Sequence, residues 1–142
     1  MIIVDSNHLR VLRNLGSAGD RLKAKIVVDG RQPCTTVINV HESINGYFSL
    51  INRAKTVHQK VLPYRGLSDT LDYFANWTIL PFDDFAAAEF DRLRLHRELK
   101  RIGTMDLQLA AIAIYNGATL LTSDGDFDAI AHHSHLDVQD WL

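Results

Sequence analysis

The stretch from Met105 to Phe127, MDLQLAAIAIYNGATLLTSDGDF, decides how this chain folds. Its first half carries apolar residues at helical spacing and is closed by Gly117, which predicts a helix that ends there. Its second half contains a short apolar run, TLLTS from Thr119, that is typical of a buried strand. The helix covers roughly 15 Å, and the strand returns about 20 Å. We therefore expect Asp124, after the strand, to lie near Asp106, at the start of the helix.

The rest of the chain repeats this alternation. Strands are expected in MIIV from Met1, in TTVINV from Thr35 and, more weakly, in WTILPF from Trp77. Helices are expected over residues 8–16 closed by Gly16, 20–30 closed by Gly30, 41–53, 55–76 with a break near Pro63 and Gly66, and 83–101. Buried strands between amphipathic helices predict a three-layer α/β/α fold with a mostly parallel sheet, to which the final LDVQDWL run adds an edge strand.

Composition limits the class of protein. A chain of 142 residues, 46% of them hydrophobic, has the size of one domain, and we expect residues 1–142 to form one. The formal net charge of −2 excludes a protein that grips nucleic acid by bulk positive charge. Cys34 is the only cysteine, which fits a reducing cytosol. The N-terminus has no basic leader, and the longest apolar run is about half of the roughly 20 residues that span a bilayer. We expect a soluble, cytoplasmic protein with no membrane contact.

Carboxylates follow the expected strands. Asp5 comes directly after the first, Glu42 two residues after the second, and Asp124 after the TLLTS strand. Each acid alone has a structural explanation, because Asp106 and Asp126 can cap helices and Glu42 can favour a helix dipole. Ligands of such sheets bind beyond the carboxyl ends of the strands, so these acids should converge and repel one another unless a cation lies among them. Ligation by oxygen alone points to Mg²⁺ or Mn²⁺ rather than zinc.

Three segments resemble the PIN domain family, and within it the VapC-type toxins of bacterial toxin–antitoxin pairs. They are IIVDSN from Ile2, TTVINVHESINGY from Thr35 and, most specifically, IGTMDLQLAAIAIYNGATLLTSDGDF from Ile102. The resemblance implies four catalytic acids that bind the metal: Asp5, Glu42, Asp106 and Asp124. It makes Asp126 either a further metal ligand or a group that positions water. It also implies three residues that hold these carboxylates by hydrogen bonds: Asn7, Thr104 and Thr122. Met105 and His41 depart from the family's usual residue types, but neither replaces an acid.

The same resemblance implies an activity and partners. One or two Mg²⁺ or Mn²⁺ ions would activate water for hydrolysis of RNA phosphodiester bonds. A homodimer and a groove for a helix of a small antitoxin protein are also implied. The stretch from Ile44 to Leu71 offers an apolar surface for such partners: Tyr47, Phe48, Leu50, Ile51, Val57, Val61, Leu62 and Tyr64. Ordinary core packing is the alternative explanation for these side chains.

Basic residues and histidines carry weaker signals. Lys100 and Arg101 precede Asp106 closely, so they are candidates for RNA phosphate contact, although such residues also form ordinary solvated helix faces. His41 lies beside a presumed ligand and either supports it or faces solvent. The histidines at 132, 133 and 135 match no zinc motif by their spacing. Asp128 is expected to be a solvated residue.

Two other functions stay open. A non-catalytic PIN-like binding module would keep the fold and use it only to dock a partner. A receiver domain or a phosphatase that forms a phosphoaspartate also places an acid after the first strand and binds Mg²⁺. The phosphatase expects a second aspartate two residues later, where this chain has Asn7, and both expect a lysine near the site. The four acids favour the nuclease.

Overall fold

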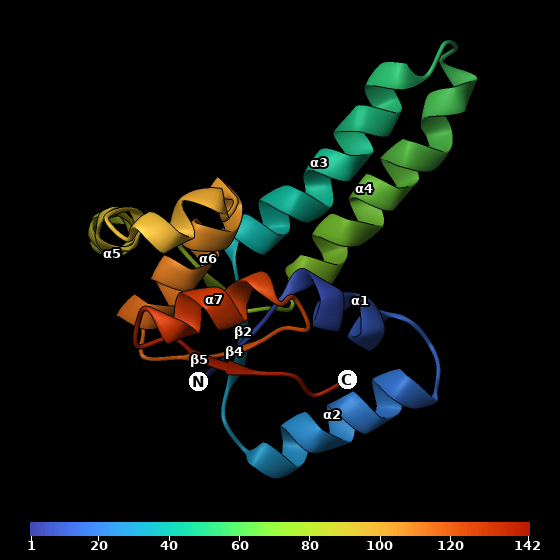
Figure 1. The fold of residues 1–142 in the computed structure, drawn as a ribbon. Coiled ribbons are helices and arrows are strands. Elements are labelled where there is room, and N and C mark those ends of the chain that lie inside the picture. Colours follow the sequence, from blue (N-terminus) through green and yellow to red (C-terminus); the bar gives the residue numbers. More distant parts are fainter.

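The protein, described over residues 1–142 by a computed structural model, alternates helices with short strands along the whole chain (Figure 1). In chain order the elements are β1 (Ile2–Val4), α1 (Ser6–Arg13), α2 (Ser17–Asp29), β2 (Pro33–Thr36), α3 (Val37–Arg53), the 3-10 helix η1 (His58–Lys60), α4 (Val61–Phe74), β3 (Ile79–Leu80), α5 (Asp84–Arg94), the 3-10 helix η2 (Arg97–Arg101), α6 (Thr104–Tyr115), β4 (Thr119–Leu121), α7 (Asp126–His132) and β5 (Asp137–Gln139).

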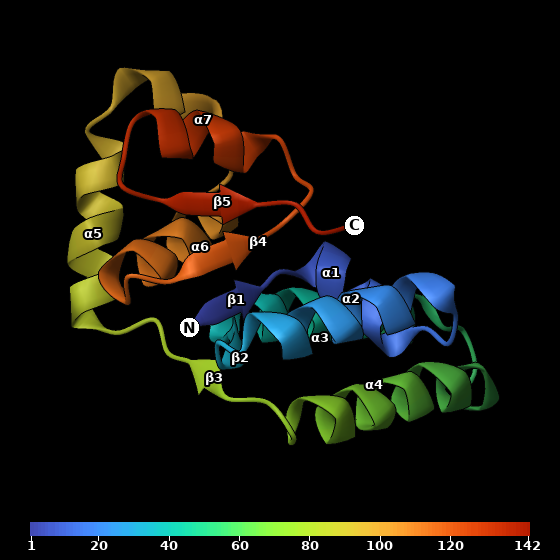
Figure 2. The same cartoon turned by 90° about the horizontal axis from the view of Figure 1, so that it is seen from below.

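The five strands form one sheet in the order β3-β2-β1-β4-β5, and every neighbouring pair is parallel. Successive side chains of a strand point to opposite faces, and β1 shows this directly. Ile2 and Val4 pack with α1, α2 and the end of α4, whereas Ile3 packs with α5, α6 and α7. Figures 1 and 2 show α2 on one side of the strands and α6 and α7 on the other. The predicted three-layer α/β/α fold is confirmed, and β5 is the predicted edge strand.

Helix ends follow the glycines at two of the three predicted positions. Gly30 and Gly117 adopt positive φ, 74° and 57°, and α2 and α6 end just before them. Gly16 does not close α1, which ends at Arg13. It instead precedes α2 as its N-cap residue.

The predicted strand from Thr35 to Val40 is too long, and the helix predicted from His41 begins earlier. β2 ends at Thr36, whose hydroxyl accepts a hydrogen bond from the backbone N–H of Asn39 and so caps α3. The β-branched run after Thr36 is therefore the first turn of a helix. The capping geometry outweighed the local strand preference, and Glu42 consequently lies in the second turn of α3.

The predicted break near Pro63 and Gly66 is wrong. Pro63 lies in the first turn of α4, where a missing N–H costs little. Gly66 is in the helix because the ring of Tyr47 on α3 fills the space beside it: a Cβ there would lie 2.3 Å from Tyr47 Cε1. Helix α4 runs without interruption from Val61 to Phe74, directly after η1. The predicted helix over 83–101 is likewise divided, since α5 ends at Arg94 and η2 follows.

Helices α3 and α4 form an antiparallel hairpin that extends away from the sheet (Figure 1). Most of the predicted apolar surface lies on it and is exposed, including Phe48, Val57 and Leu62. Ile51 is buried, so for this residue the core-packing alternative holds. No helix of the protein is both long and apolar enough to cross a membrane.

Candidate metal centre

Asp5 lies at the carboxyl end of β1, buried and surrounded by donors. Its backbone N–H donates to Leu121 O at 3.0 Å, which continues the pairing of β1 with β4. One carboxylate oxygen accepts from Ser6 N at 2.6 Å and Asn39 Nδ2 at 2.7 Å. The other accepts from Thr122 Oγ1 at 2.8 Å and Asn7 Nδ2 at 3.2 Å. Burial raises the pKa of Asp5, the hydrogen bonds from Thr122, Ser6 and Asn39 oppose the rise, and the charge of Asp124 adds to it. Four donors thus hold one buried carboxylate in place.

Thr122 joins the ends of β1 and β4. Its hydroxyl donates to Asp5 and accepts from Asn7 Nδ2 at 3.0 Å and from the backbone N–H of Asp124 at 3.1 Å. The exposed Asp124 carboxylate in turn accepts from the backbone N–H of Asp126 at 3.0 Å. Asp124 therefore also shapes the turn that leads into α7, and Asp126 is the first residue of that helix rather than its cap.

Glu42 reaches the same edge from α3. Its carboxylate accepts a hydrogen bond from Ser6 Oγ, and Ser6 Oγ accepts from Asn39 Nδ2 at 3.2 Å. Asn39 is fully buried and accepts from Thr36 Oγ1 at 2.7 Å. Ser6 and Asn39 thus connect Glu42 to Asp5. Neither residue was predicted from the sequence; the available signal was a polar Asn within an apolar run, since a buried amide requires hydrogen-bond partners.

Asp106 lies in the first turn of α6. Its pKa is raised to about 6, first by burial and then by the negative charges of four other acids: Asp124, Asp126, Asp5 and Glu42. The prediction that Asp106 and Asp124 come together is confirmed. Gly103 leaves room for this side chain, since a Cβ there would lie 2.9 Å from Asp106 Oδ2.

The donor set fits a hard divalent cation. Five carboxylates lie within range of one another's charge at one edge of the sheet, with no three of them bringing their oxygens within 4.8 Å of one another. Such oxygens are the ligands that Mg²⁺ and Mn²⁺ prefer. Mutual repulsion of this kind is relieved when a cation is bound among the acids. Asp5 already accepts four hydrogen bonds, about as many as a carboxylate has lone-pair sites. Direct coordination by Asp5 would require it to release one, and the longest comes from Asn7.

The other predicted residues lie around this centre. Thr104 begins α6 with an exposed side chain, and no hydrogen bond ties it to a carboxylate. Lys100 and Arg101 end η2 and are exposed. His41 is exposed beside Glu42, and Asp128 is exposed in the first turn of α7.

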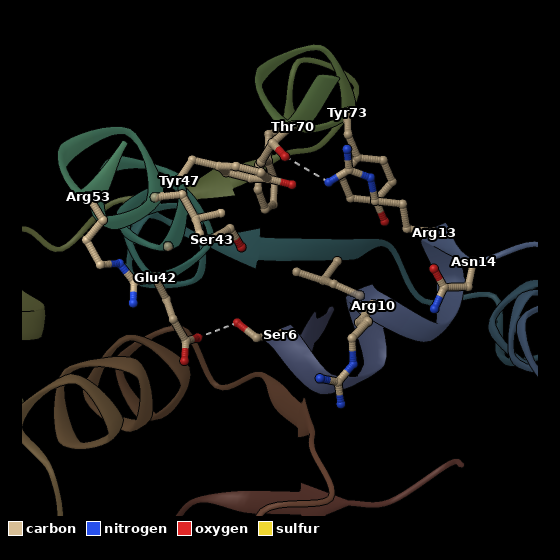
Figure 3. A pocket seen from close by; sticks show the side chains of 14 residues that line it. Ser6, Arg10, Arg13, Asn14, Glu42, Ser43, Tyr47, Arg53, Thr70 and Tyr73 are labelled. Carbon is tan, nitrogen blue, oxygen red and sulfur yellow. Dashed lines mark hydrogen bonds between the residues drawn. The ribbon is translucent and has the colours of Figure 1, made fainter. Parts of the chain in front are cut away.

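A cavity of about 730 Å³ opens beside the acids, between α1, α3 and α4 (Figure 3). Ser6 and Glu42 belong to its wall, which it therefore shares with the acidic edge. Three arginines also line it: Arg10, Arg13 and Arg53. Arg13 donates to Thr70 Oγ1 at 2.9 Å and lies over the ring of Tyr73. These arginines come from α1 and α3, which meet only in the folded chain, so their spacing in the sequence does not group them.

A buried histidine, His8, holds Asn7 in place by a hydrogen bond. His8 Nε2 accepts from the backbone N–H of Trp141 at 3.1 Å, so Nδ1 carries the proton and donates to Asn7 Oδ1 at 2.7 Å. Burial lowers the pKa of His8, although the charge of Asp140 opposes this. The C-terminal segment is thereby linked, through His8 and Asn7, to Asp5.

The family model described as PIN domain matches residues 2–133. Ribonuclease VapC5 of Mycobacterium tuberculosis is 38% identical over 63 residues, 43% of this chain and 47% of that protein. The chain therefore spans about half the length of the curated relative it matches.

Solved structures share the whole fold at low sequence identity. The DNA-bound VapBC of Salmonella typhimurium contains a chain that is 20% identical, with a TM-score of 0.75 and complete coverage of both chains. VapBC-5 of Mycobacterium tuberculosis, a member of the VapBC family of toxin–antitoxin systems, is 22% identical with a TM-score of 0.65, over 99% of this chain and 98% of that one. At these identities the likeness concerns the fold.

Proposed function

Since the chain belongs to the PIN domain family, we propose that it is a metal-dependent endoribonuclease that hydrolyses RNA phosphodiester bonds, as the toxin of a type II toxin–antitoxin pair. One observation carries the proposal: acids from β1, α3, α6 and the β4–α7 turn converge at one edge of the sheet, and four of them raise the pKa of Asp106. The name ribonuclease for the curated relative supports RNA as the substrate. Residues 1–142 would act as one PIN-like domain in the cytoplasm, where RNA is available.

Five acids would hold the cation in this proposal: Asp5, Glu42, Asp106, Asp124 and Asp126. Bound Mg²⁺ or Mn²⁺ supplies Lewis acidity, which lowers the pKa of water and neutralises charge on the phosphate. The side chains of the protein would position the carboxylates. Thr122, Ser6 and Asn39 fix Asp5 by hydrogen bonds, and Ser6 also fixes Glu42. Preorganised carboxylates avoid the cost of reorganisation during the reaction.

The nucleophile in this mechanism is water. The two hydroxyls nearest to Asp5, those of Ser6 and Thr122, already donate to carboxylates. Attack of water on phosphorus forms the new P–O bond and breaks the bond to O3′, which leaves a 5′-phosphate and a 3′-hydroxyl. Exposed carboxylates such as Asp124 and Asp126 are suited to orient the attacking water and accept its proton.

RNA binding would use positive charge near the acids. Arg10, Arg13 and Arg53 line the cavity beside Glu42, and guanidinium groups suit phosphate oxygens. Lys100 and Arg101 end η2, a few residues before Asp106. Arg92 is less available, because it pairs with Glu89. These contacts would position the RNA backbone rather than select a base sequence.

The exposed hairpin of α3 and α4 supports the partner proposals. Its apolar side chains would bury against a second copy of this chain or against a helix of a small antitoxin protein, as exposed apolar patches do. Relatives of this fold occur in VapBC complexes, including one bound to DNA. A strict monomer by light scattering at tens of micromolar would contradict the dimer. Failure of the chain to copurify with the small protein encoded by an adjacent reading frame would contradict the proposal that an antitoxin binds it.

A non-catalytic PIN-like module remains the second candidate, and the exposed hairpin is the observation that favours it. The match of the PIN domain model to residues 2–133 disfavours the phosphatase or receiver alternative.

Replacement of Asp106 by Asn tests the proposal. Asp106→Asn should lower cleavage of a pool of structured RNAs about 10²- to 10³-fold, corresponding to several kcal/mol of transition-state stabilisation. It should leave the metal-free melting temperature unchanged or slightly raised, because it removes one of several repelling charges. The exposed Asp128→Asn is the matched control and should cleave at the wild-type rate.

Two outcomes would overturn this assignment. Full cleavage in EDTA would exclude the metal mechanism. An Asp106→Asn protein that melts several degrees lower yet cleaves normally would make Asp106 a structural residue and would favour the non-catalytic module.

A further inference from the structure

A second group of metal-ligating side chains lies away from the acids. His96, Glu98 and His133 each offer one ligand atom, and these atoms lie within 4.8 Å of one another. His96 and Glu98 belong to the start of η2, whereas His133 follows α7 as its C-cap residue. We call these three residues the histidine cluster. Spacing in the sequence gave no signal for it, because its members come from segments that meet only in the fold.

The backbone under the histidine cluster is held by the core. Leu93, Leu99 and Ile130 are almost completely buried in the same hydrophobic cluster. His96 N donates to Leu93 O at 3.1 Å, Leu99 N donates to His96 O at 3.2 Å, and His133 N donates to Ile130 O at 3.1 Å. Each histidine is therefore anchored through a hydrogen bond to a buried residue. Such support is what a preorganised ligand set requires.

The side chains of the histidine cluster are free to bind. None of the chain's ion pairs includes them. The rings of His96 and His133 lie near each other, with centroids 5.8 Å apart, and His132 lies 5.1 Å from His133 in an edge-to-face arrangement. The surroundings thus offer three imidazoles and one carboxylate within a small volume at the protein surface.

We propose that the histidine cluster binds a borderline transition-metal ion, with Zn²⁺ as the best fit. Two imidazole nitrogens and one carboxylate oxygen, completed by water or His132, match the four-coordinate preference of Zn²⁺. With metal–ligand bonds of about 2.0–2.1 Å, tetrahedral ligands lie about 3.3 Å apart. The ligand atoms of the histidine cluster lie within 4.8 Å of one another, so they would have to approach by at most about 1.5 Å to reach that separation. The acidic edge differs in chemistry, because its ligands are all oxygens and suit Mg²⁺.

The bound ion would link η2 to the end of α7. η2 carries Lys100 and Arg101 and leads to Gly103 and Asp106, while α7 begins at Asp126. An ion that binds the folded chain and not the unfolded chain stabilises the folded state by mass action. Zn²⁺ should therefore raise the melting temperature and reduce the mobility of η2. This inference is independent of the nuclease proposal.

Co²⁺ as a spectroscopic probe and Zn²⁺ as a competitor test the proposal on the full chain, with Mg²⁺ in excess. Four-coordinate Co²⁺ with imidazole ligands absorbs visible light strongly, whereas Co²⁺ in an octahedral oxygen site absorbs weakly. Wild-type protein should develop the strong bands at one equivalent of Co²⁺ and lose them on addition of one equivalent of Zn²⁺. Zn²⁺ should also raise its melting temperature by several degrees.

Two variants and one control make the test decisive. His133→Ala and Glu98→Gln should each weaken binding at least tenfold and abolish the thermal shift. His135→Ala, a neighbouring exposed histidine outside the histidine cluster, should bind as wild type does. Unchanged Co²⁺ spectra and affinity in both His133→Ala and Glu98→Gln would overturn the proposal, as would a wild-type protein that shows no strong bands. Melts without metal verify that each variant is folded. Binding is the readout, so loss of RNA cleavage would not affect the outcome.

Discussion

Helix α6 and the hairpin of α3 and α4 are both rich in apolar residues, yet the protein buries the first and exposes the second. In α6, every residue from Leu109 to Ala113 is at most 3% exposed, because the helix lies against the sheet between α5 and α7. In the hairpin, Val57 is 77% and Leu62 is 71% exposed. Each region also delivers an acid to the same centre, Asp106 from α6 and Glu42 from α3. Position over the sheet, and not apolar content, decides which helix belongs to the core.

Truncation of one apolar residue in each region should give the largest difference in the free energy of unfolding. Ile112→Ala leaves a cavity at a position with no exposure and should lower the free energy of unfolding by about 2–5 kcal/mol. Leu62→Ala should change it by less than about 0.5 kcal/mol. Urea unfolding of both variants measures the difference. Equal losses would mean that the hairpin is covered in solution, for example by a second copy.

Two glycines of the hairpin test how tightly α3 and α4 are packed. Gly66→Ala would push a methyl group into the ring of Tyr47 and should cost about 1–3 kcal/mol. Gly46→Ala, in open space within α3, should instead stabilise the protein by up to about 1 kcal/mol through helix propensity. Thermal melts of both variants measure these changes in stability. A stabilised Gly66→Ala protein would show that the two helices can separate freely.

Gly103→Ala probes the acid of α6 without removing a charge. The backbone at Gly103, with φ of −60°, accepts alanine, but the new Cβ would lie 2.9 Å from Asp106 Oδ2 and displace the carboxylate. We expect about a tenfold loss in RNA cleavage, equivalent to about 1.4 kcal/mol, with little change in the melting temperature. Gly125→Ala, in open space between Asp124 and Asp126, is the control. Normal cleavage by Gly103→Ala would indicate that the position of this oxygen is unimportant.

The pH dependence of stability gives the smallest expected effect. The pKa of Asp106 in the folded protein is about 6, above its ordinary value of 3.8, so the folded state binds this proton more tightly than the unfolded state. Asp106 should therefore contribute stability to the metal-free protein as the pH falls from about 7 to about 5, by a few degrees in melting temperature at most. Buried His8, whose pKa is lowered, acts in the opposite direction over this range, so the measurement is the difference in melting temperature between wild-type protein and Asp106→Asn. This difference should shift in favour of the wild type as the pH falls, and a difference that does not change with pH would contradict the crowding of the acids around Asp106.

Much of the fold was predictable because its signals are local. Alternation of apolar strands with helices indicated the three-layer fold, and element lengths placed Asp106 near Asp124. The predicted ends of helices and strands were wrong where a side-chain contact decides where an element begins or ends. Thr36 caps α3 and converts a β-branched run into helix, and Tyr47 makes Gly66 suitable for the interior of α4. The catalytic and metal-binding roles of the acids stay predictions until they are measured.

By itself, the sequence determined the fold class, the family resemblance and the acids that follow the strands, because periodicity and spacing act over a few residues along one chain. Only the tertiary structure decided which groups hold those acids, since Ser6 and Asn39 reach Asp5 and Glu42 across separate elements. It also brought His133 to His96 and Glu98 and left the α3–α4 hairpin exposed. These features depend on which distant segments come together when the core forms, and no local pattern encodes that meeting.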